Sequence, residues 1–509
     1  MLIIAVLAFA LKASASEFST GPNGINSRAL GLTGSGVAIG QVESGRPGMP
    51  VKNATPFDDP MWVHNQVQPA NVFAGTTDDS SNSAHVIYQT MPLEPEEDRE
   101  GLHATQVAGV MIANATTPSL QGVAPAASLY ASAINGAPVG LTTDQRFAMS
   151  ANRLATHSAD VRVINVSARR PLADEFQHTD GNQHATQFVD WSTNEHDVLY
   201  VLGGGESVPV DVPQDNFNCI TVAASDRLTS GSGPFQRVAD LNLNDFDAEP
   251  GVRTTIDIIA PGVDIVMTGQ GSSPSIASGT SFASPHVAGT VALLQEWTNK
   301  RILENAPRWS DNAKEPEVMK AILLNTADKL NNVHGSKRDN FLQDGVTKWT
   351  DTTAGTDESV SLDEHMGAGH LNAKNAFDNF KVGEYDAGTV PLIGWDYGSV
   401  GFLNNVEYTF NGQTSGWIAV TLAWNRTVVK TSDDPYLPTD LFSTYSPVDE
   451  TGLATVMSDL NISLIDTSNG TVKHSSVTTV DNLEHIFFEV EAGNYKIEVS
   501  HFGGGVDDA

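Results

Sequence analysis

Cysteine is nearly absent from the chain, because Cys219 is the single cysteine among 509 residues. One thiol cannot form an intramolecular disulfide, so buried apolar surface has to stabilise the fold, and a chain of this length can bury enough. Cys219 lies in the apolar segment 217–225, which reads as a buried strand. We therefore expect this thiol to act as a small hydrophobic side chain and not as a nucleophile.

Basic residues are also scarce, since 28 Lys and Arg stand against 61 Asp and Glu, a formal net charge of −33. Such a chain repels nucleic acid and anionic membrane surfaces, so we expect neither as a partner. The acidity is typical of solubility in high salt, and it is also compatible with calcium ligation or with attraction of basic substrates. No contiguous EF-hand loop occurs, and the metal ligands stay unknown. The carboxylate clusters that could hold calcium are Asp433 with Asp434, and Asp481 and Asn482 with Glu484.

Long apolar runs are missing apart from residues 2–11 at the amino terminus. This run is too short to span a bilayer, which needs about 20 apolar residues. It precedes the small residues Ala13, Ser14 and Ala15, a pattern that predicts a signal peptide over residues 1–15, although no basic residue comes before the run. We expect a secreted protein without stable membrane insertion, and its oligomeric state is left open.

The most informative segment is GTSFASPHVAG at residues 279–289. Ser281 follows a Gly-Thr turn and precedes apolar residues at helical spacing, so its hydroxyl is predicted at the amino end of a helix. Free backbone N–H groups and the helix dipole at that end favour developing negative charge. Pro285 is compatible only with the start of such a helix. These features fit a serine nucleophile, and they also occur in ordinary core helices.

Two earlier segments contain a histidine and a carboxylate, the residue types that can act as a general base and as the acid that orients it. His103 stands in GLHATQVAG at residues 101–109, whose small residues allow a helix to pack closely on a sheet. Glu43 ends the strand-like segment GLTGSGVAIGQVESG at residues 31–45. The three segments, in this order, resemble the motifs of the subtilisin-like serine proteases, and the resemblance covers roughly residues 28–381.

The resemblance implies an α/β fold, a subtilisin-like parallel sheet flanked by helices over residues 16–383. It also implies a serine endopeptidase that hydrolyses protein or peptide substrates through an acyl-enzyme. Ser281 would attack, His103 would transfer protons and Glu43 would orient His103. No cofactor is required for this chemistry, although a structural calcium ion is compatible with the family.

The acid position departs from the family, which has aspartate where this chain has Glu43. Glutamate keeps the charge and adds one methylene, about 1.5 Å of reach. The oxyanion position departs too, because the family's asparagine is replaced by Gly204 or Gly205 in the segment 198–205. Glycine has no side-chain donor, so we expect backbone N–H groups, chiefly that of Ser281, or a bound water to hold the oxyanion.

Substrate recognition also differs, because Ser167, Ala168 and Arg169 stand where the family has a strand that pairs with the substrate backbone. Arg169 replaces a glycine there, and it either lines the side-chain pocket or turns to solvent. Specificity therefore cannot be carried over from the family.

After residue 383 the sequence changes to short segments of alternating apolar and polar residues separated by turn signals. This pattern predicts an antiparallel β-sandwich over residues 384–509, similar to the jelly-roll module appended to some secreted family members.

The substitutions at the acid and oxyanion positions leave an alternative to the enzyme. That alternative is a catalytically degenerate subtilisin-like scaffold that acts as an extracellular binding protein.

Overall fold

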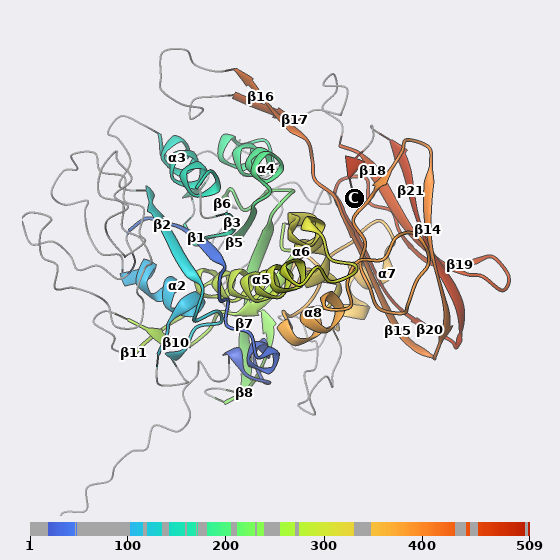
Figure 1. Cartoon of the computed structure of the whole chain (residues 1–509), viewed down its shortest axis with the longest axis horizontal. Coiled ribbons are helices and arrows are strands. Elements are labelled where there is room, and N and C mark those ends of the chain that lie inside the picture. Colours follow the sequence, from blue (N-terminus) through green and yellow to red (C-terminus); the bar gives the residue numbers. More distant parts are fainter. Residues whose placement is uncertain are drawn as a thin grey trace, which may run out of the picture.

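A computed structural model gives the arrangement of the chain in two parts, a sheet flanked by helices and a set of antiparallel strands at one end (Figure 1). The structure describes residues 19–45, 47, 102–115, 120–134, 142–157, 160–168, 170–171, 181–204, 211–229, 232–238, 255–269, 274–329, 348–432, 444–447, 457–503 and 507–508. The predicted signal peptide, Arg169, Gly205 and the Asp433–434 pair lie outside the described residues.

Seven strands of the described chain form the central sheet, in the order β2-β1-β3-β5-β7-β8 with β9 beside β7. These strands are β1 (Ala38–Glu43), β2 (Ser128–Ala133), β3 (Val161–Val166), β5 (Leu199–Gly203), β7 (Ile220–Thr229), β8 (Ser232–Val238) and β9 (Ile258–Pro261). All neighbouring strands run parallel except β7 and β8. This sheet confirms the predicted α/β class.

Successive side chains of each strand point to opposite faces of the sheet, and each face has its own apolar core. In β1, Ile39 belongs to one buried cluster, whereas Ala38 and Val42 belong to the other. The first face is covered by α2 (Leu102–Ile112) and α5 (Thr280–Leu303), and the second by α3 (Thr143–Ala155) and α4 (His184–His196). Because helices cover both faces of the sheet, all six residues of β1 are buried.

Shorter elements complete this part of the chain. They are η1 (Ser27–Leu30), β4 (Arg170–Pro171), β6 (Asp211–Val212), β10 (Ile265–Thr268), β11 (Pro274–Ala277), η5 (Asp311–Lys314), α6 (Pro316–Asn325), η6 (Trp349–Asp351), α7 (Thr353–Thr356) and α8 (Ala373–Phe380).

The carboxyl-terminal part contains a five-stranded sheet in the order β12-β14-β21-β18-β19 and a separate β15-β20 pair. The strands are β12 (Gly388–Thr389), β13 (Ser399–Val400), β14 (Asn405–Gln413), β15 (Gly416–Ala423), β16 (Val428–Ser432), β17 (Thr444–Pro447), β18 (Asp459–Asp466), β19 (Thr471–Ser476), β20 (Leu483–Val490), β21 (Gly493–Gly503) and β22 (Asp507–Asp508). Ile418 of β15 and Ile486 of β20 share one buried cluster with Ile462 and Ile497 of the larger sheet. The two layers therefore form the predicted antiparallel β-sandwich, while its jelly-roll topology and the domain limits stay predictions.

Arg426, which follows β15, joins the sandwich to the helical part. Its guanidinium donates hydrogen bonds to Asp190 Oδ2 of α4 at 2.6 Å and to the Gly181 carbonyl at 2.8 Å. The same group lies over the Phe217 ring, 4.2 Å from its centroid. Both charged side chains are buried, at 5% exposure for Arg426 and 0% for Asp190. The ion pair therefore forms part of the interface between the two parts.

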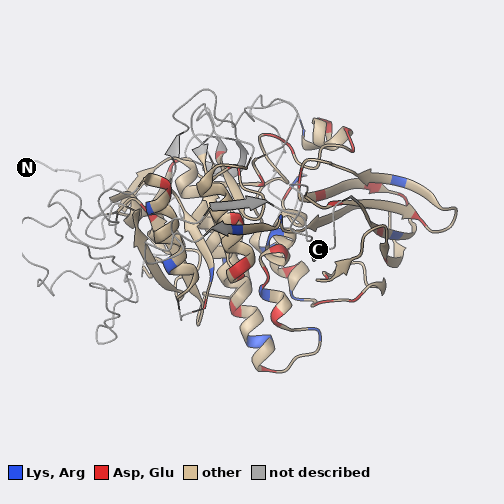
Figure 2. Ribbon diagram, turned by 90° about the horizontal axis from the view of Figure 1, so that it is seen from above, with Lys and Arg blue, Asp and Glu red and all other residues tan. Residues whose placement is uncertain are grey.

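Acidic residues occur on helices and strands of both parts of the chain (Figure 2). Among the residues that the structure describes, no helix is both long enough and apolar enough to cross a membrane.

The first prediction concerns the interface. Arg426→Ala leaves the Asp190 carboxylate buried without its counterion, so we expect a loss of about 3–5 kcal/mol in the free energy of unfolding. Urea denaturation followed by circular dichroism measures this loss. Lys496→Ala is the control, because Lys496 pairs with Glu407 at the surface of the sandwich, and we expect little change there. Equal effects of the two substitutions would contradict the anchoring role of Arg426.

Candidate active site

Glu43 and His103 meet at the carboxyl end of the central sheet. Glu43 is the last residue of β1, and its Oε2 lies 3.1 Å from His103 Nδ1. Helix α2 is held beside β1 because Gln41 Nε2 donates to the Ala104 carbonyl at 2.9 Å. Glu43 is only 2% exposed, whereas the His103 side chain is 45% exposed. The carboxylate is thus fixed and buried, and the imidazole that it orients faces solvent.

Ser281 is the second residue of α5, so its N–H belongs to the first helical turn and has no intrahelical acceptor. His103 lies against the next residue, Phe282, with the ring centroids 5.5 Å apart. The packing of α2 against α5 therefore brings the predicted nucleophile Ser281 close to the predicted base His103. The predicted helix start is confirmed.

Pro285 lies inside α5 and has no N–H to donate to the carbonyl of Ser281, four residues earlier. That carbonyl instead accepts a hydrogen bond from Ser167 Oγ at 3.1 Å. Ser167 Oγ in turn accepts from Asn165 Nδ2 at 2.9 Å and lies 3.2 Å from Ser284 Oγ. The Ser167 hydroxyl is therefore committed to holding the nucleophile's backbone, a role that sequence reasoning did not assign to it.

A cavity of about 370 Å³ brings the predicted site residues together. Glu43, His103 and Ser281 all line it. Its other described lining residues are Ser44, Gly45, Ala104, Ser167, Ala168, Gly203, Gly204, Gln214 and Thr280. Of the predicted substrate-binding residues, Ser167 and Ala168 thus lie in the cavity, and Arg169 falls outside the described residues.

Gly203 is the last residue of β5, and Gly204 follows it, beside the predicted nucleophile Ser281. A Cβ on Gly203 would lie 3.2 Å from the Ser281 nitrogen and 3.1 Å from the Thr280 carbonyl carbon, so a larger residue would push the first turn of α5 away by a few tenths of an ångström. Both backbone groups of Gly204 are hydrogen-bonded. Its N–H donates to Val222 O at 2.8 Å, and its carbonyl accepts from Thr280 Oγ1 at 2.6 Å. Its N–H is therefore not available to an oxyanion in this arrangement.

Gln214 is a residue of this cavity that sequence reasoning missed. It is 1% exposed, and it is the single carboxamide among the described lining residues. Its Nε2 donates to the Gly203 carbonyl at 3.0 Å. It belongs to none of the recognised motifs, so no signal in the sequence placed it near Ser281.

Two groups named from the sequence lie away from this site. Cys219 is fully buried, and burial raises the pKa of its thiol far above the ordinary value, which agrees with a structural role.

Glu484 accepts hydrogen bonds from Ser361 Oγ at 3.0 Å and from the Thr478 N–H at 2.7 Å. No cluster of three or more metal-ligating side chains occurs in the described ranges. The Glu484 carboxylate therefore serves internal hydrogen bonds of the sandwich.

The Subtilase family model matches residues 23–363. The chain belongs to the subtilase family. Subtilisin BL of Lederbergia lenta is 28% identical over 218 residues, which cover 42% of this chain and 71% of that protein. The alkaline protease of Shouchella clausii is 28% identical over 218 residues, which cover 50% of that protein. Among solved structures, a protease from Pseudoalteromonas arctica PAMC 21717 aligns at 17% identity with a TM-score of 0.42, over 72% of this chain and 98% of that chain.

Membership of the subtilase family supports serine endopeptidase activity, and it agrees with the resemblance that the three motifs carry. Sequence identity to the curated subtilisins stays below one third, so the roles of individual side chains have to be argued from this chain's own geometry.

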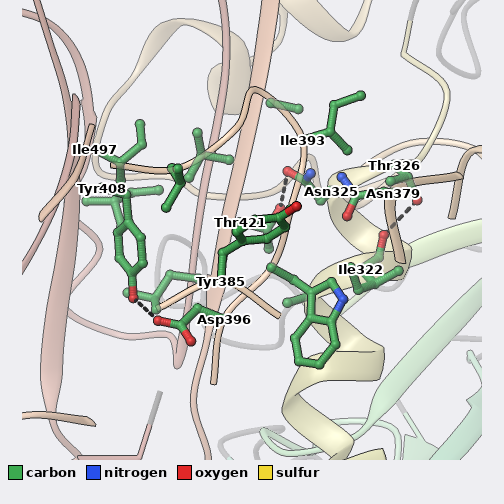
Figure 3. Close-up of a pocket in the computed structure, with 18 of the residues that line it drawn as sticks. Ile322, Asn325, Thr326, Asn379, Tyr385, Ile393, Asp396, Tyr408, Thr421 and Ile497 are labelled. Atoms are coloured by element: carbon green, nitrogen blue, oxygen red, sulfur yellow. Dashed lines mark hydrogen bonds between the residues drawn. The ribbon is translucent and has the colours of Figure 1, made fainter. Parts of the chain in front are cut away.

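A second cavity, of about 910 Å³, lies where α6 and α8 face β14 and β15, beneath the connecting residues 385–400. In Figure 3, Tyr408 and Ile497 stand on one side of it and Ile322 and Thr326 on the other. Its polar contacts include the hydrogen bond from Tyr408 Oη to Asp396 Oδ2 at 2.8 Å. None of the three catalytic candidates lines this cavity, whereas all three line the smaller one.

The second prediction concerns Gly204. A Cβ there would lie 3.0 Å from Ile256 Cδ1 and 3.3 Å from Val222 O, so an asparagine side chain would be forced into packed residues. We expect Gly204→Asn to lower the free energy of unfolding by about 1–3 kcal/mol without adding an oxyanion donor. Thermal unfolding and the rate of labelling by a fluorophosphonate measure the two effects.

Gly398→Asn is the matched control, because the nearest atom to a Cβ at Gly398 is Asp396 Oδ2 at 4.0 Å. A Gly204→Asn protein with an unchanged melting temperature and faster labelling would contradict this geometry.

Proposed function

We propose that the protein is a secreted serine endopeptidase with a Ser-His-Glu triad. The observation that carries the proposal is the 3.1 Å contact between His103 Nδ1 and Glu43 Oε2, in a cavity that Ser281 also lines. Membership of the subtilase family supports the reaction class. The apolar run at residues 2–11 supports export.

In the proposed mechanism, His103 removes the proton of Ser281 Oγ as that oxygen attacks the substrate carbonyl. The positive charge that then forms on the imidazole is stabilised by the buried Glu43 carboxylate, to which Nδ1–H donates. His103 next gives the proton to the leaving amine, and an acyl-enzyme remains on Ser281. A water molecule then attacks the acyl carbonyl while His103 removes its proton, and His103 returns that proton to Ser281 Oγ as the acid product leaves. No cofactor takes part in these steps.

The oxyanion is assigned to the Ser281 N–H, which belongs to the first turn of α5, where the helix dipole also favours negative charge. Of the two glycines predicted at this position, Gly204 already donates its N–H within the sheet. Gly205 is therefore the better of the two as a second backbone donor. Protein or peptide chains are the proposed substrates, and neither nucleic acid nor a membrane is a proposed partner.

The alternative function is an extracellular binding protein on a degenerate scaffold. One observation favours it: the larger cavity, about 910 Å³, lies away from the triad and within the range of ligand-binding pockets. A scaffold that had lost catalysis, however, would have no need to keep a buried carboxylate hydrogen-bonded to an exposed histidine.

The third prediction tests the nucleophile. A fluorophosphonate probe should label the folded protein covalently at Ser281, as found by mass spectrometry of the labelled peptide. Ser281→Ala should remove both labelling and peptide hydrolysis. Ser150→Ala is the control, because Ser150 is a buried serine on α3 that does not line the cavity, and the labelling of Ser281 should persist in this variant. A folded protein that the probe leaves unmodified would favour the binding protein.

The fourth prediction tests the acid. Glu43→Gln keeps the shape of the side chain but removes the charge that stabilises the imidazolium, so kcat should fall by roughly 10³–10⁴-fold with little change in KM. Glu43→Asp should also lower kcat, because pairing of Glu43 with Ala133 fixes the backbone and the shorter side chain cannot reach His103. Steady-state kinetics on a peptide substrate give both values.

Glu407→Gln, a neutralised carboxylate on the sandwich, is the control and should keep the activity of the unchanged protein. If Glu43→Gln is as active as this control, another carboxylate orients His103.

A further inference from the structure

Strand β15 has a free edge. Among the described strands it pairs with β20 alone, although β14, which precedes it in the chain, belongs to the larger sheet. β15 is eight residues long, is almost entirely apolar, and contains neither a proline nor a charged residue. Folded proteins usually block such an edge with a charge, a proline or a bulge, because it is a template for pairing with another chain. None of these three devices is present in β15.

The register of the β15–β20 pair shows which backbone groups point to the free edge. The Trp424 N–H donates to the Asn482 carbonyl at 3.2 Å, one position beyond the paired residues of the two strands. Hydrogen-bonded and non-hydrogen-bonded residues alternate along an antiparallel pair. The N–H and C=O groups of Trp417, Ala419 and Thr421 therefore point away from β20.

The partner strand supports this assignment. His485 stands opposite Thr421, and its N–H donates to Ser476 Oγ at 3.1 Å, on the side of β20 away from β15. At the free edge of β15, no hydrogen bond from another described residue reaches the outward backbone groups of Trp417, Ala419 or Thr421. Each of these residues thus offers one donor and one acceptor in the pattern of a strand without its neighbour.

The larger cavity runs along this edge. Residues 417–423 all line it. Because successive side chains of a strand point to opposite faces, a cavity that touches every one of these residues follows the edge and not a single face. Residues 419–422 are partly exposed, and Trp417 is 40% exposed. Thr421 marks the edge in the middle of the cavity in Figure 3. The edge is therefore open to a molecule that enters the cavity.

The side chains of the cavity indicate the chemistry of such a molecule. One basic residue, Lys329, lines the cavity against five acidic ones. The acidic residues are Glu317, Asp328, Asp378, Asp386 and Asp396. Burial, together with the nearby carboxylates of Glu384 and Asp386, raises the pKa of Asp396, and a positive charge would relieve this repulsion. Leu392 and Ile393 also line the cavity, and each is 52% exposed. A ligand with basic and apolar side chains complements this lining.

The same charge argument disfavours an occupant from this chain. The carboxyl-terminal segments outside the described residues, 433–443, 448–456 and 504–506, contain no lysine or arginine. A second copy of the chain carries the same net charge of −33, so the two copies repel each other. Charge complementarity thus favours a different polypeptide at the edge of β15.

We infer that the free edge of β15 is a second binding site, to which an extended polypeptide rich in basic and apolar residues adds as a further strand. Its backbone bonds the outward groups of Trp417, Ala419 and Thr421, and its side chains enter the cavity on both faces of β15. That the bound polypeptide is also a substrate rests on the proposed function, whereas the binding itself does not.

The test uses a fluorescein-labelled octapeptide of alternating lysine and valine with the Ser281→Ala protein, which cannot cleave it. Fluorescence anisotropy gives Kd. N-methylation of every second amide removes the donors along one edge of the peptide, and the complementary set of N-methyl groups removes those along the other edge. One set should raise Kd by at least about 10-fold, because several hydrogen bonds are lost, and the other set is the matched control and should change Kd little.

The position of the bound peptide is measured separately, because the cleft beside Ser281 binds peptides under the proposed function. Hydrogen exchange followed by mass spectrometry should show slower exchange of the amides of residues 416–423 when the peptide is present. Ala419→Pro removes an outward N–H without removing a bond of the β15–β20 ladder, and it should raise Kd by at least about 10-fold. Glu407→Gln, on the neighbouring strand, should leave Kd unchanged.

Three results overturn the inference. They are equal binding of the two N-methyl sets, unchanged exchange of residues 416–423, and unchanged Kd in a folded Ala419→Pro protein. If Ala419→Pro does not fold, the exchange measurement decides. A dimer of the free protein whose formation protects the same amides also overturns the inference, because a second copy then occupies the edge. Failure of the proposed function is distinct: it removes fluorophosphonate labelling of Ser281 and leaves the anisotropy and exchange results intact.

Discussion

The contact between the end of β5 and the first turn of α5 is the constraint on which the proposed site depends. Gly203 approaches so closely that an added Cβ would lie 3.2 Å from the Ser281 nitrogen. Thr280 Oγ1 bonds the Gly204 carbonyl, and Ser167 Oγ bonds the Ser281 carbonyl that Pro285 leaves free. The backbone at Ser281 is therefore held by the residues that follow β3 and β5, and its N–H lies at the start of the helix.

The segment between β6 and β7 connects this site with the sandwich. Gln214 lines the catalytic cavity, and a few residues later Phe217 lies under the Arg426 guanidinium. Asn218 donates to the Arg426 carbonyl at 2.8 Å, and its N–H donates to Asp190 at 2.9 Å. The sandwich thus packs on a segment that also lines the cavity with Ser281. Its contacts stabilise one wall of the cavity, although it contributes no side chain to that cavity among the described residues.

Residues within recognised motifs were predictable from the sequence, and residues that act across the fold were not. Ser281, His103 and Glu43 each sit in a segment with a specific pattern, and the structure places all three in one cavity. Ser167 was assigned to substrate binding, but its hydroxyl holds the Ser281 carbonyl, a contact between residues 114 positions apart. Gln214 has no motif around it. Neither role could be inferred, because a hydrogen bond between distant segments leaves no local pattern.

From the sequence alone, the motifs around Ser281, His103 and Glu43 and their resemblance to the subtilisin-like family predicted the fold class and the three candidate residues, because such motifs are local in the sequence. Only the tertiary structure decided which backbone groups remain free for chemistry. Gly204 and Gly205 are equivalent in the sequence, yet pairing of β5 with β7 places the Gly204 N–H on Val222. Likewise, the Gly203 carbonyl orients Gln214. Such assignments depend on neighbours that are adjacent in space alone.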